Sequence, residues 1–275
     1  MFKELLKKWL AEILSKFNQA GDGTELLTEA INGLNDGLYG YVKTIMQSVV
    51  MPVAYTILAL FFMLELYKAS QRVEGIGGGS SLGAEVIFKA MFKMALCKLA
   101  VDSSLLFMEA IYAVFQKITS GIETAITIDP GIDGPIDLDA LNHHIDSLGL
   151  GDQIGMLIEL VIVKFGVWII MGLVKVICIA RFIEIYMYVA ISPIPIATFP
   201  SDEMSQIGKN FLKSFAAVCL QGTLIFLVLS FFPLLLSEQL LGNDVSAFNL
   251  LLYSLVLILA VFGANRYAKS MLNAV

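Results

Sequence analysis

Apolar and polar positions divide the chain into long apolar runs separated by shorter polar stretches. A helix needs roughly 20 mostly apolar residues to cross a hydrocarbon core of ~30 Å at a rise of ~1.5 Å per residue. Runs of that length occupy residues 44–66, 94–116, 154–180, 209–236 and 247–264. The pattern therefore predicts an all-α polytopic membrane protein with about five transmembrane helices.

The composition supports this class. Hydrophobic residues make up 57% of the 275 residues, charged residues make up 15%, and the mean hydropathy is +0.79. A soluble domain usually has about 25% charged and about 45–50% apolar residues. The segments between the runs are each too short for an independent soluble core of ~50 residues. The net charge of −6 gives no general attraction to nucleic acid.

The N-terminal segment 1–43 is amphipathic. Large apolar residues recur at helical spacing along 1–20 and again along 27–38, with lysines and glutamates opposite them in the first stretch. Such helices lie flat at the membrane surface or pack on a neighbouring subunit. The sequence leaves both interpretations open.

The next two segments are expected to differ in composition and in their position relative to the membrane. Segment 44–116 holds the first two transmembrane helices, and a glycine-rich stretch makes 67–93 a flexible cytoplasmic linker between them. Segment 117–153 is acidic and rich in glycine and proline, which predicts an extracytoplasmic loop.

A core of three transmembrane helices is expected at 154–275, with a proline-broken segment at 192–200. The apolar stretch that begins at residue 154 is nearly twice as long as one span. It forms either one long helix that projects beyond the bilayer or two spans that meet near Arg181. Pro193 and Pro195 must end this helix, because proline lacks an N–H donor and clashes with the preceding turn.

Basic residues near the helix ends predict the orientation, since Lys and Arg concentrate on the cytoplasmic side. They occur around 67–93, around 181–208 and near the C-terminus, whereas 237–246 has none and 117–153 has only Lys117. Five spans with an external N-terminus and an internal C-terminus satisfy this distribution. Six spans would place residues 200–208 outside and rank second.

Six ionisable residues interrupt the predicted spans: Lys98, Asp102, Glu109, Glu159, Lys164 and Lys175. The spacing of Lys98, Asp102 and Glu109 places them on one helix face. A charge at the bilayer centre costs about 2.5–3.5 kcal/mol on insertion scales, so this face should contact protein or water. The six residues either form salt bridges that fix packing or a subunit interface, or line a polar pathway.

The sequence predicts no enzyme and no cofactor, because it contains no motif of hydrolytic, zinc or nucleotide chemistry. His143 and His144 are adjacent and cannot form the i, i+4 pair that binds a metal. We therefore interpret both histidines as solvated residues of the loop. Cys97, Cys178 and Cys219 lie in apolar runs and are expected to pack as small hydrophobic residues.

The layout resembles the TrbL-like polytopic inner-membrane subunit of type IV secretion systems. The local resemblance lies in the long helix 154–190, the following Ile191-Ser192-Pro193-Ile194-Pro195-Ile196-Ala197, and the segment 208–213, which leads into the apolar stretch 215–236. In that family a helix, a proline-broken turn and a helix that re-enters the membrane occur in this order.

The resemblance implies a multi-pass subunit of a bacterial cytoplasmic membrane machine that passes single-stranded DNA, protein or both. It implies several copies of the chain beside secretion ATPases and other transfer subunits. Lys89, Lys93 and Lys209 are then candidate substrate-facing residues, although each could instead anchor the chain on the cytoplasmic side. Two alternatives remain: a secondary transporter or ion channel that uses the intramembrane charges, and a membrane scaffold or assembly factor.

Overall fold

The computed structural model describes residues 4–9, 12, 26–75, 80–128, 150–240 and 247–274. Within these ranges the chain is helical and has no strand. The elements are α3 (Asp36–Ile45), η1 (Met46–Val50), α4 (Met51–Gly75), α5 (Ser80–Asp102), α6 (Ser104–Ile128), α8 (Leu150–Ile191), α9 (Pro193–Ile196), α10 (Ser205–Leu240) and α11 (Ala247–Met271). The prediction of an all-α fold is confirmed.

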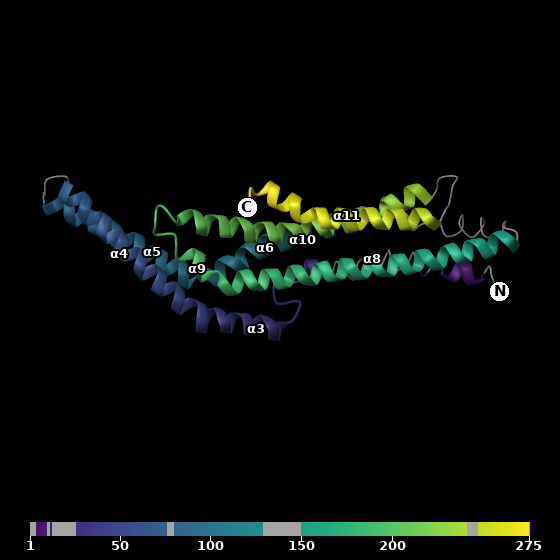
Figure 1. Cartoon of the computed structure of the whole chain (residues 1–275), viewed down its shortest axis with the longest axis horizontal. Coiled ribbons are helices and arrows are strands. Elements are labelled where there is room, and N and C mark those ends of the chain that lie inside the picture. Colours follow the sequence, from purple (N-terminus) through teal and green to yellow (C-terminus); the bar gives the residue numbers. More distant parts are fainter. Residues whose placement is uncertain are drawn as a thin grey trace. The chain divides into compact units, whose positions relative to one another are not determined.

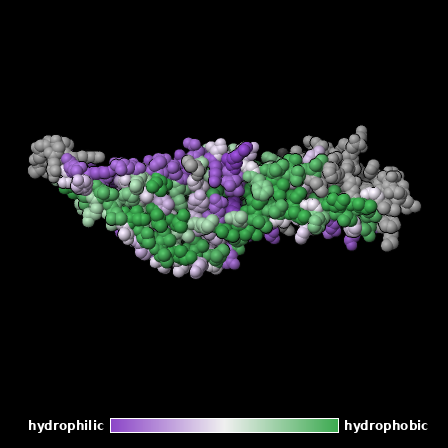
Figure 2. All heavy atoms as spheres, viewed as in Figure 1, coloured by the Kyte–Doolittle hydropathy of each residue, from purple (hydrophilic) through white to green (hydrophobic). Residues whose placement is uncertain are grey.

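Four helical segments in the described residues are long and apolar enough to cross a membrane: Asp36–Gln71, Ser104–Ala125, Leu160–Ile191 and Ser205–Phe231. We refer to them as the candidate spans. They correspond to four of the five predicted runs, and the fifth run, 247–264, lies in α11, which is only partly described at the level of side chains. Hydrophobic residues accordingly cover much of the surface that Figure 2 shows.

The internal contacts of the chain divide it into two compact units that interleave along the sequence. Unit 1 consists of Met1–Ala30, Phe115–Arg181 and Leu220–Ala268. Unit 2 consists of Ile31–Val114, Phe182–Cys219 and Lys269–Val275.

In unit 2, α3, η1 and α4 follow one another without a break from Asp36 to Gly75. At ~1.5 Å per residue this helical stretch is about 60 Å long. It begins with a helix cap, because the side chain of Asn35 accepts a 2.9 Å hydrogen bond from the Leu38 backbone N–H. Helix α5 returns antiparallel to α4, and the two pack side by side (Figure 1).

The second apolar region differs from its prediction. Helix α5 ends at Asp102 and α6 begins at Ser104, although helical hydrogen bonds continue across Ser103, from Ser103 N to Leu99 O and from Phe107 N to Ser103 O. The predicted span 94–116 crosses this boundary, whereas the candidate span is Ser104–Ala125. The candidate span begins where α6 begins, so Lys98 and Asp102 lie before it in α5.

Helix α6 continues to Ile128 and so includes the first part of the stretch predicted as a loop. Residues 129–149, with His143 and His144, lie outside the described residues, as do residues 76–79 of the predicted glycine-rich linker. Of the predicted N-terminal helix, residues 4–9 and 12 are described and are helical.

The apolar stretch that begins near residue 154 forms one long helix and not two. Helix α8 has 42 residues, which corresponds to about 63 Å. It ends at Ile191, directly before Ser192 and the two prolines, and α9 is a single turn from Pro193 to Ile196. The chain then turns and enters α10 at Ser205.

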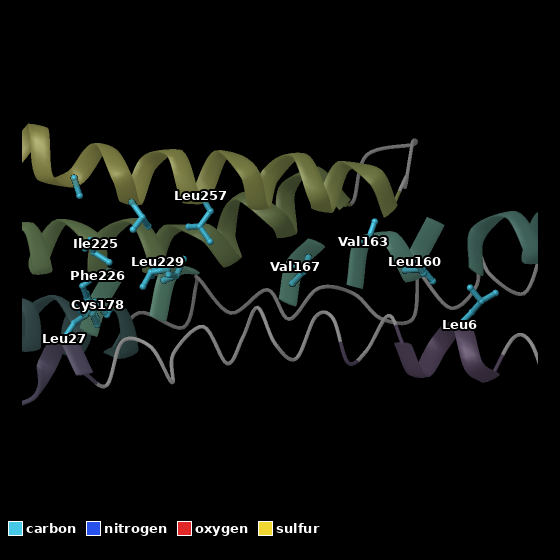
Figure 3. Packing of buried hydrophobic residues seen from close by; sticks show 13 residues of the cluster. Leu6, Leu27, Leu160, Val163, Val167, Cys178, Ile225, Phe226, Leu229 and Leu257 are labelled. Atoms are coloured by element: carbon cyan, nitrogen blue, oxygen red, sulfur yellow. The ribbon is translucent and has the colours of Figure 1, made fainter. Parts of the chain in front are cut away.

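The core of unit 1 joins α8, α10 and α11 with two residues from the N-terminal segment (Figure 3). Its fully or almost fully buried members are Leu6, Leu27, Leu160, Val163, Val167, Val174, Cys178, Ile225, Phe226, Leu229, Leu257, Val261 and Ala264. The N-terminal segment therefore contributes to an apolar core of its own chain.

Candidate functional site: polar contacts among the apolar helices

Three polar contacts join the continuous helix α3–η1–α4 to α5 and α6 in unit 2, and we call them the polar ladder. The first joins Lys93 Nζ to Glu65 Oε1 at 3.5 Å. In the second, Tyr55 donates a 2.6 Å hydrogen bond to Asp102 Oδ1, and Lys98 Nζ lies 3.3 Å from Asp102 Oδ2.

The third contact of the polar ladder lies at Glu109. Tyr39 donates a 2.8 Å hydrogen bond to Glu109 Oε1, and Lys43 Nζ lies 3.3 Å from the same oxygen. The Lys43 ammonium also lies 4.5 Å from the centroid of the Tyr39 ring. Each acidic group of the ladder thus has a cation beside it, which reduces the cost of placing charge among apolar helices.

The middle contact is only half covered. The side chains of Lys98 and Asp102 are 64% and 38% exposed, and their neighbours Leu96 and Leu99 are also exposed. Charged groups within an apolar segment face protein or water rather than lipid. This part of unit 2 therefore presents a charged pair beside exposed apolar side chains.

The proline-broken turn after α8 is buried in unit 2. Ile196 and Ala197 are fully buried against Ala54 and Leu58 of α4 and against Cys97 and Val101 of α5. Ser192 closes the end of α8, since its hydroxyl donates a 2.9 Å hydrogen bond to Val189 O.

Helix α10 approaches this turn closely at Gly208. A Cβ atom on Gly208 would lie 2.7 Å from the carbonyl oxygen of Pro195 and 2.5 Å from Cε1 of Phe199. Both distances are shorter than any normal contact. The turn and the start of α10 pack together because residue 208 has no side chain.

Two ion pairs connect the α4–α5 hairpin to the residues after this turn. Lys93 Nζ lies 2.7 Å from Asp202 Oδ1, and Lys68 Nζ lies 2.8 Å from Glu203 Oε1. Burial alone would lower the pKa of Lys93, but its hydrogen bond to Asp202 and the charges of Glu65 and Asp202 outweigh burial and raise the pKa above 10.5. The parts of α4 around Lys68 and of α5 around Lys93 thus lie beside residues 202–203.

Unit 1 contains a buried polar layer that the sequence analysis missed. Arg181, only 4% exposed, lies with its guanidinium group where a side chain on Gly222 would begin. Next to Gly222, Thr223 shares a buried 2.9 Å hydrogen bond with Thr119 of α6. The available sequence signal was an arginine within an apolar run, which we treated only as a marker of a helix end.

The N-terminal segment covers part of α8 in unit 1. Lys164 Nζ lies 2.7 Å from Glu12 Oε2 and 5.4 Å from the centroid of the Trp9 ring. Leu6 on the same segment is fully buried. Lys164 therefore has its counter-charge within its own chain.

The remaining predicted site residues are not brought together with these contacts. Lys89 pairs with Glu85 at 2.6 Å on the exposed side of α5, and this hydrogen bond lowers the pKa of Glu85. The side chains of Lys175 and Lys209 are exposed. The side chain of Glu159 lies outside the description.

No cluster of three or more histidine, cysteine, aspartate or glutamate residues in the described chain could hold a metal ion. The cysteines Cys97, Cys178 and Cys219 are free thiols and are buried.

An all-helical chain with several apolar candidate spans, joined by polar contacts between its helices, is a polytopic membrane protein. Its sequence matches a family model described as TrbL/VirB6 plasmid conjugal transfer like protein over residues 18–193. A second model with the same description matches residues 138–273. The protein belongs to the TrbL/VirB6 family of plasmid conjugal transfer proteins, which confirms the resemblance seen in the sequence. Comparisons with curated proteins and with solved structures gave no match.

Proposed function

We propose that this protein is a multi-pass subunit of the inner-membrane part of a type IV secretion system and forms part of the passage for DNA, protein or both. Membership of the TrbL/VirB6 family supports the role in conjugal transfer. The candidate spans support a location within the membrane.

The structural observation that carries the proposal is the half-exposed Lys98–Asp102 pair at the end of α5, which lies just before the candidate span Ser104–Ala125 and beside the exposed Leu96 and Leu99. Charged residues beside exposed leucines suit neither lipid, which does not solvate charge, nor water, in which large apolar side chains are unfavourable. A chain that assembles with other subunits can cover the pair with protein or place it beside a hydrated passage. The pair therefore supports an assembly of several chains, including further copies of this one.

The polar ladder favours a packing role for three of the six ionisable residues predicted in the spans, Lys98, Asp102 and Glu109. Asp102 and Glu109 each contact both a lysine and a tyrosine. A carboxylate that carries ions or protons has to exchange its partners during each cycle. Because Asp102 and Glu109 are already paired inside one unit, their contacts favour the role of a subunit in an assembly over the role of an ion-coupled transporter.

Affinity purification from native membranes in mild detergent, followed by mass spectrometry, tests this proposal directly. We expect secretion ATPases and other transfer subunits to accompany the protein, and we expect deletion of its gene to abolish plasmid transfer. Recovery of the protein alone, together with normal transfer from the deletion strain, would refute the proposal.

A further inference from the structure

Lys175 differs from the other lysines of the candidate spans by a combination of two features: it has no partner in the described chain, and it lies far from both ends of its span. It lies near the middle of the candidate span Leu160–Ile191, and its side chain is exposed. The neighbouring Leu173 and Val176 are exposed as well. No ion pair or hydrogen bond joins Lys175 to any residue that the structure describes.

The lysines of the ladder and of the N-terminal contact are all neutralised. Lys43, Lys98 and Lys164 pair with Glu109, Asp102 and Glu12 respectively. Other lysines in candidate spans that lack a described partner, Lys117, Lys209 and Lys213, lie closer to one end of their span. A lysine near a helix end can extend its ammonium group to the lipid headgroups, whereas a central one reaches them less easily.

The face of α8 that carries Lys175 also carries a small residue and exposed apolar side chains. Trp168, Gly172, Lys175 and Val176 share one face of α8 by their spacing. Gly172 is exposed and nothing lies within 4 Å of the position that its Cβ atom would occupy. A small residue on an exposed face allows a second helix to approach closely in a membrane.

We propose that this face of α8 binds a transmembrane helix of another transfer subunit, and that this helix carries an aspartate or glutamate that pairs with Lys175. The proposal rests on the proposed function and names the chemistry of one partner. Charge complementarity specifies a carboxylate, and the apolar neighbours of Lys175 specify a helix that is otherwise apolar.

Four described carboxylates of this chain are poor candidates for the pairing. Glu65, Asp102 and Glu109 already contact lysines of the polar ladder. Glu184 is nine residues beyond Lys175 on the same helix, which places it ~13.5 Å further along the axis and on the opposite face. In a second copy that is parallel and at the same depth in the membrane, Glu184 would also lie ~13.5 Å along the axis from Lys175 of the first copy.

Charge reversal tests the proposal in cells that carry the complete transfer machine. We expect Lys175→Arg to retain transfer within about threefold, and Lys175→Glu to reduce it by roughly 100-fold through like-charge repulsion. The amount of protein in the membrane should stay normal in both strains. Suppressors selected in the Lys175→Glu strain should replace an acidic residue by a basic one in an apolar helix of another transfer subunit.

Lys164 provides the matched control, because its carboxylate partner lies in the same chain. The defect of Lys164→Glu should be rescued by Glu12→Lys within this chain. Normal transfer by Lys175→Leu would overturn the proposal, since a lipid-facing position tolerates leucine. Suppressors of Lys175→Glu confined to this chain would also overturn it, because they would assign the face to a second copy.

The two proposals fail in distinguishable ways. If loss of the whole chain leaves transfer unchanged, the proposed function is wrong. If loss of the chain abolishes transfer while Lys175→Leu transfers normally, only the binding face on α8 is wrong.

Discussion

The guanidinium group of Arg181 occupies the space above Gly222 in which a side chain at residue 222 would begin. Arg181 is buried, so its planar group has little room to move aside. The packing of α8 against α10 in unit 1 therefore depends on the absence of a side chain at one position and on the shape of a charged side chain at another.

This contact predicts that Gly222→Ala destabilises the protein by about 1–3 kcal/mol, the usual cost of adding atoms to a packed site. The cost should fall when Arg181→Ala removes the obstructing group, so the two substitutions should be non-additive. Unfolding of the four proteins in detergent measures this coupling. Gly121→Ala is the control, because nothing lies within 4 Å of its Cβ position. An equal cost of Gly222→Ala in both backgrounds would contradict the prediction.

A second glycine prediction concerns Gly208, where α10 meets the proline-broken turn. Gly208→Ala should lower stability by about 1–3 kcal/mol, because the carbonyl oxygen of Pro195 belongs to the backbone and can move only with the turn. Gly40→Ala, in the same unit and with open space around it, should not lower stability. Thermal unfolding in detergent compares them, and equal midpoints would show that the turn adapts at little cost.

The hydrogen bond from Tyr55 to Asp102 is testable by a double-mutant cycle. Tyr55→Phe and Asp102→Asn each change one partner of the 2.6 Å contact. We expect a coupling of about 0.6 kcal/mol and no more than about 1.7 kcal/mol, the average and the maximum found for polar contacts between membrane helices. The measurement is reversible unfolding in mixed micelles. Purely additive effects would mean that the contact does not stabilise unit 2.

The sequence predicted the local features of this fold well. Long apolar runs identify candidate spans, the two prolines predict the end of the long helix that the structure ends at Ile191, and the i, i+4 spacing of Lys98 and Asp102 places both on one helix face. Each of these conclusions needs only the geometry of one helix. The length and continuity of α8 required more, because hydropathy alone does not separate one long helix from two short spans.

The contacts between helices could not be predicted from the sequence. Lys93 contacts Asp202 across 109 positions and Lys164 contacts Glu12 across 152. Periodicity indicates which face of a helix is polar, but it does not identify the helix that covers this face. The burial of Arg181 is a further example, since its place opposite a glycine follows only from the packing of α8 on α10.

The ion pair between Lys68 and Glu203 predicts on which side of the membrane residues 202–203 lie. Their charged atoms are 2.8 Å apart, so a short thiol crosslinker should join Lys68→Cys to Glu203→Cys in native membranes. The native cysteines, which are buried, would first be replaced by alanine. The sequence analysis predicts Lys117 on the opposite side, which makes Lys68→Cys with Lys117→Cys the control pair. Failure of the Lys68→Cys and Glu203→Cys pair to crosslink would contradict the prediction and would favour the arrangement with six spans, in which residues 200–208 lie on the opposite side from Lys68.

The burial of Leu6 in unit 1 predicts that the N-terminal helix stabilises its own chain. Leu6→Ala should cost about 2–5 kcal/mol, because it leaves a cavity beside an apolar core. Lys8→Ala, at an exposed position of the same segment, should change stability by less than about 0.5 kcal/mol. The check is thermal unfolding of the purified protein combined with plasmid transfer by the same variants. If Leu6→Ala leaves unfolding unchanged but lowers transfer, the helix binds a neighbouring subunit instead of the core of its own chain.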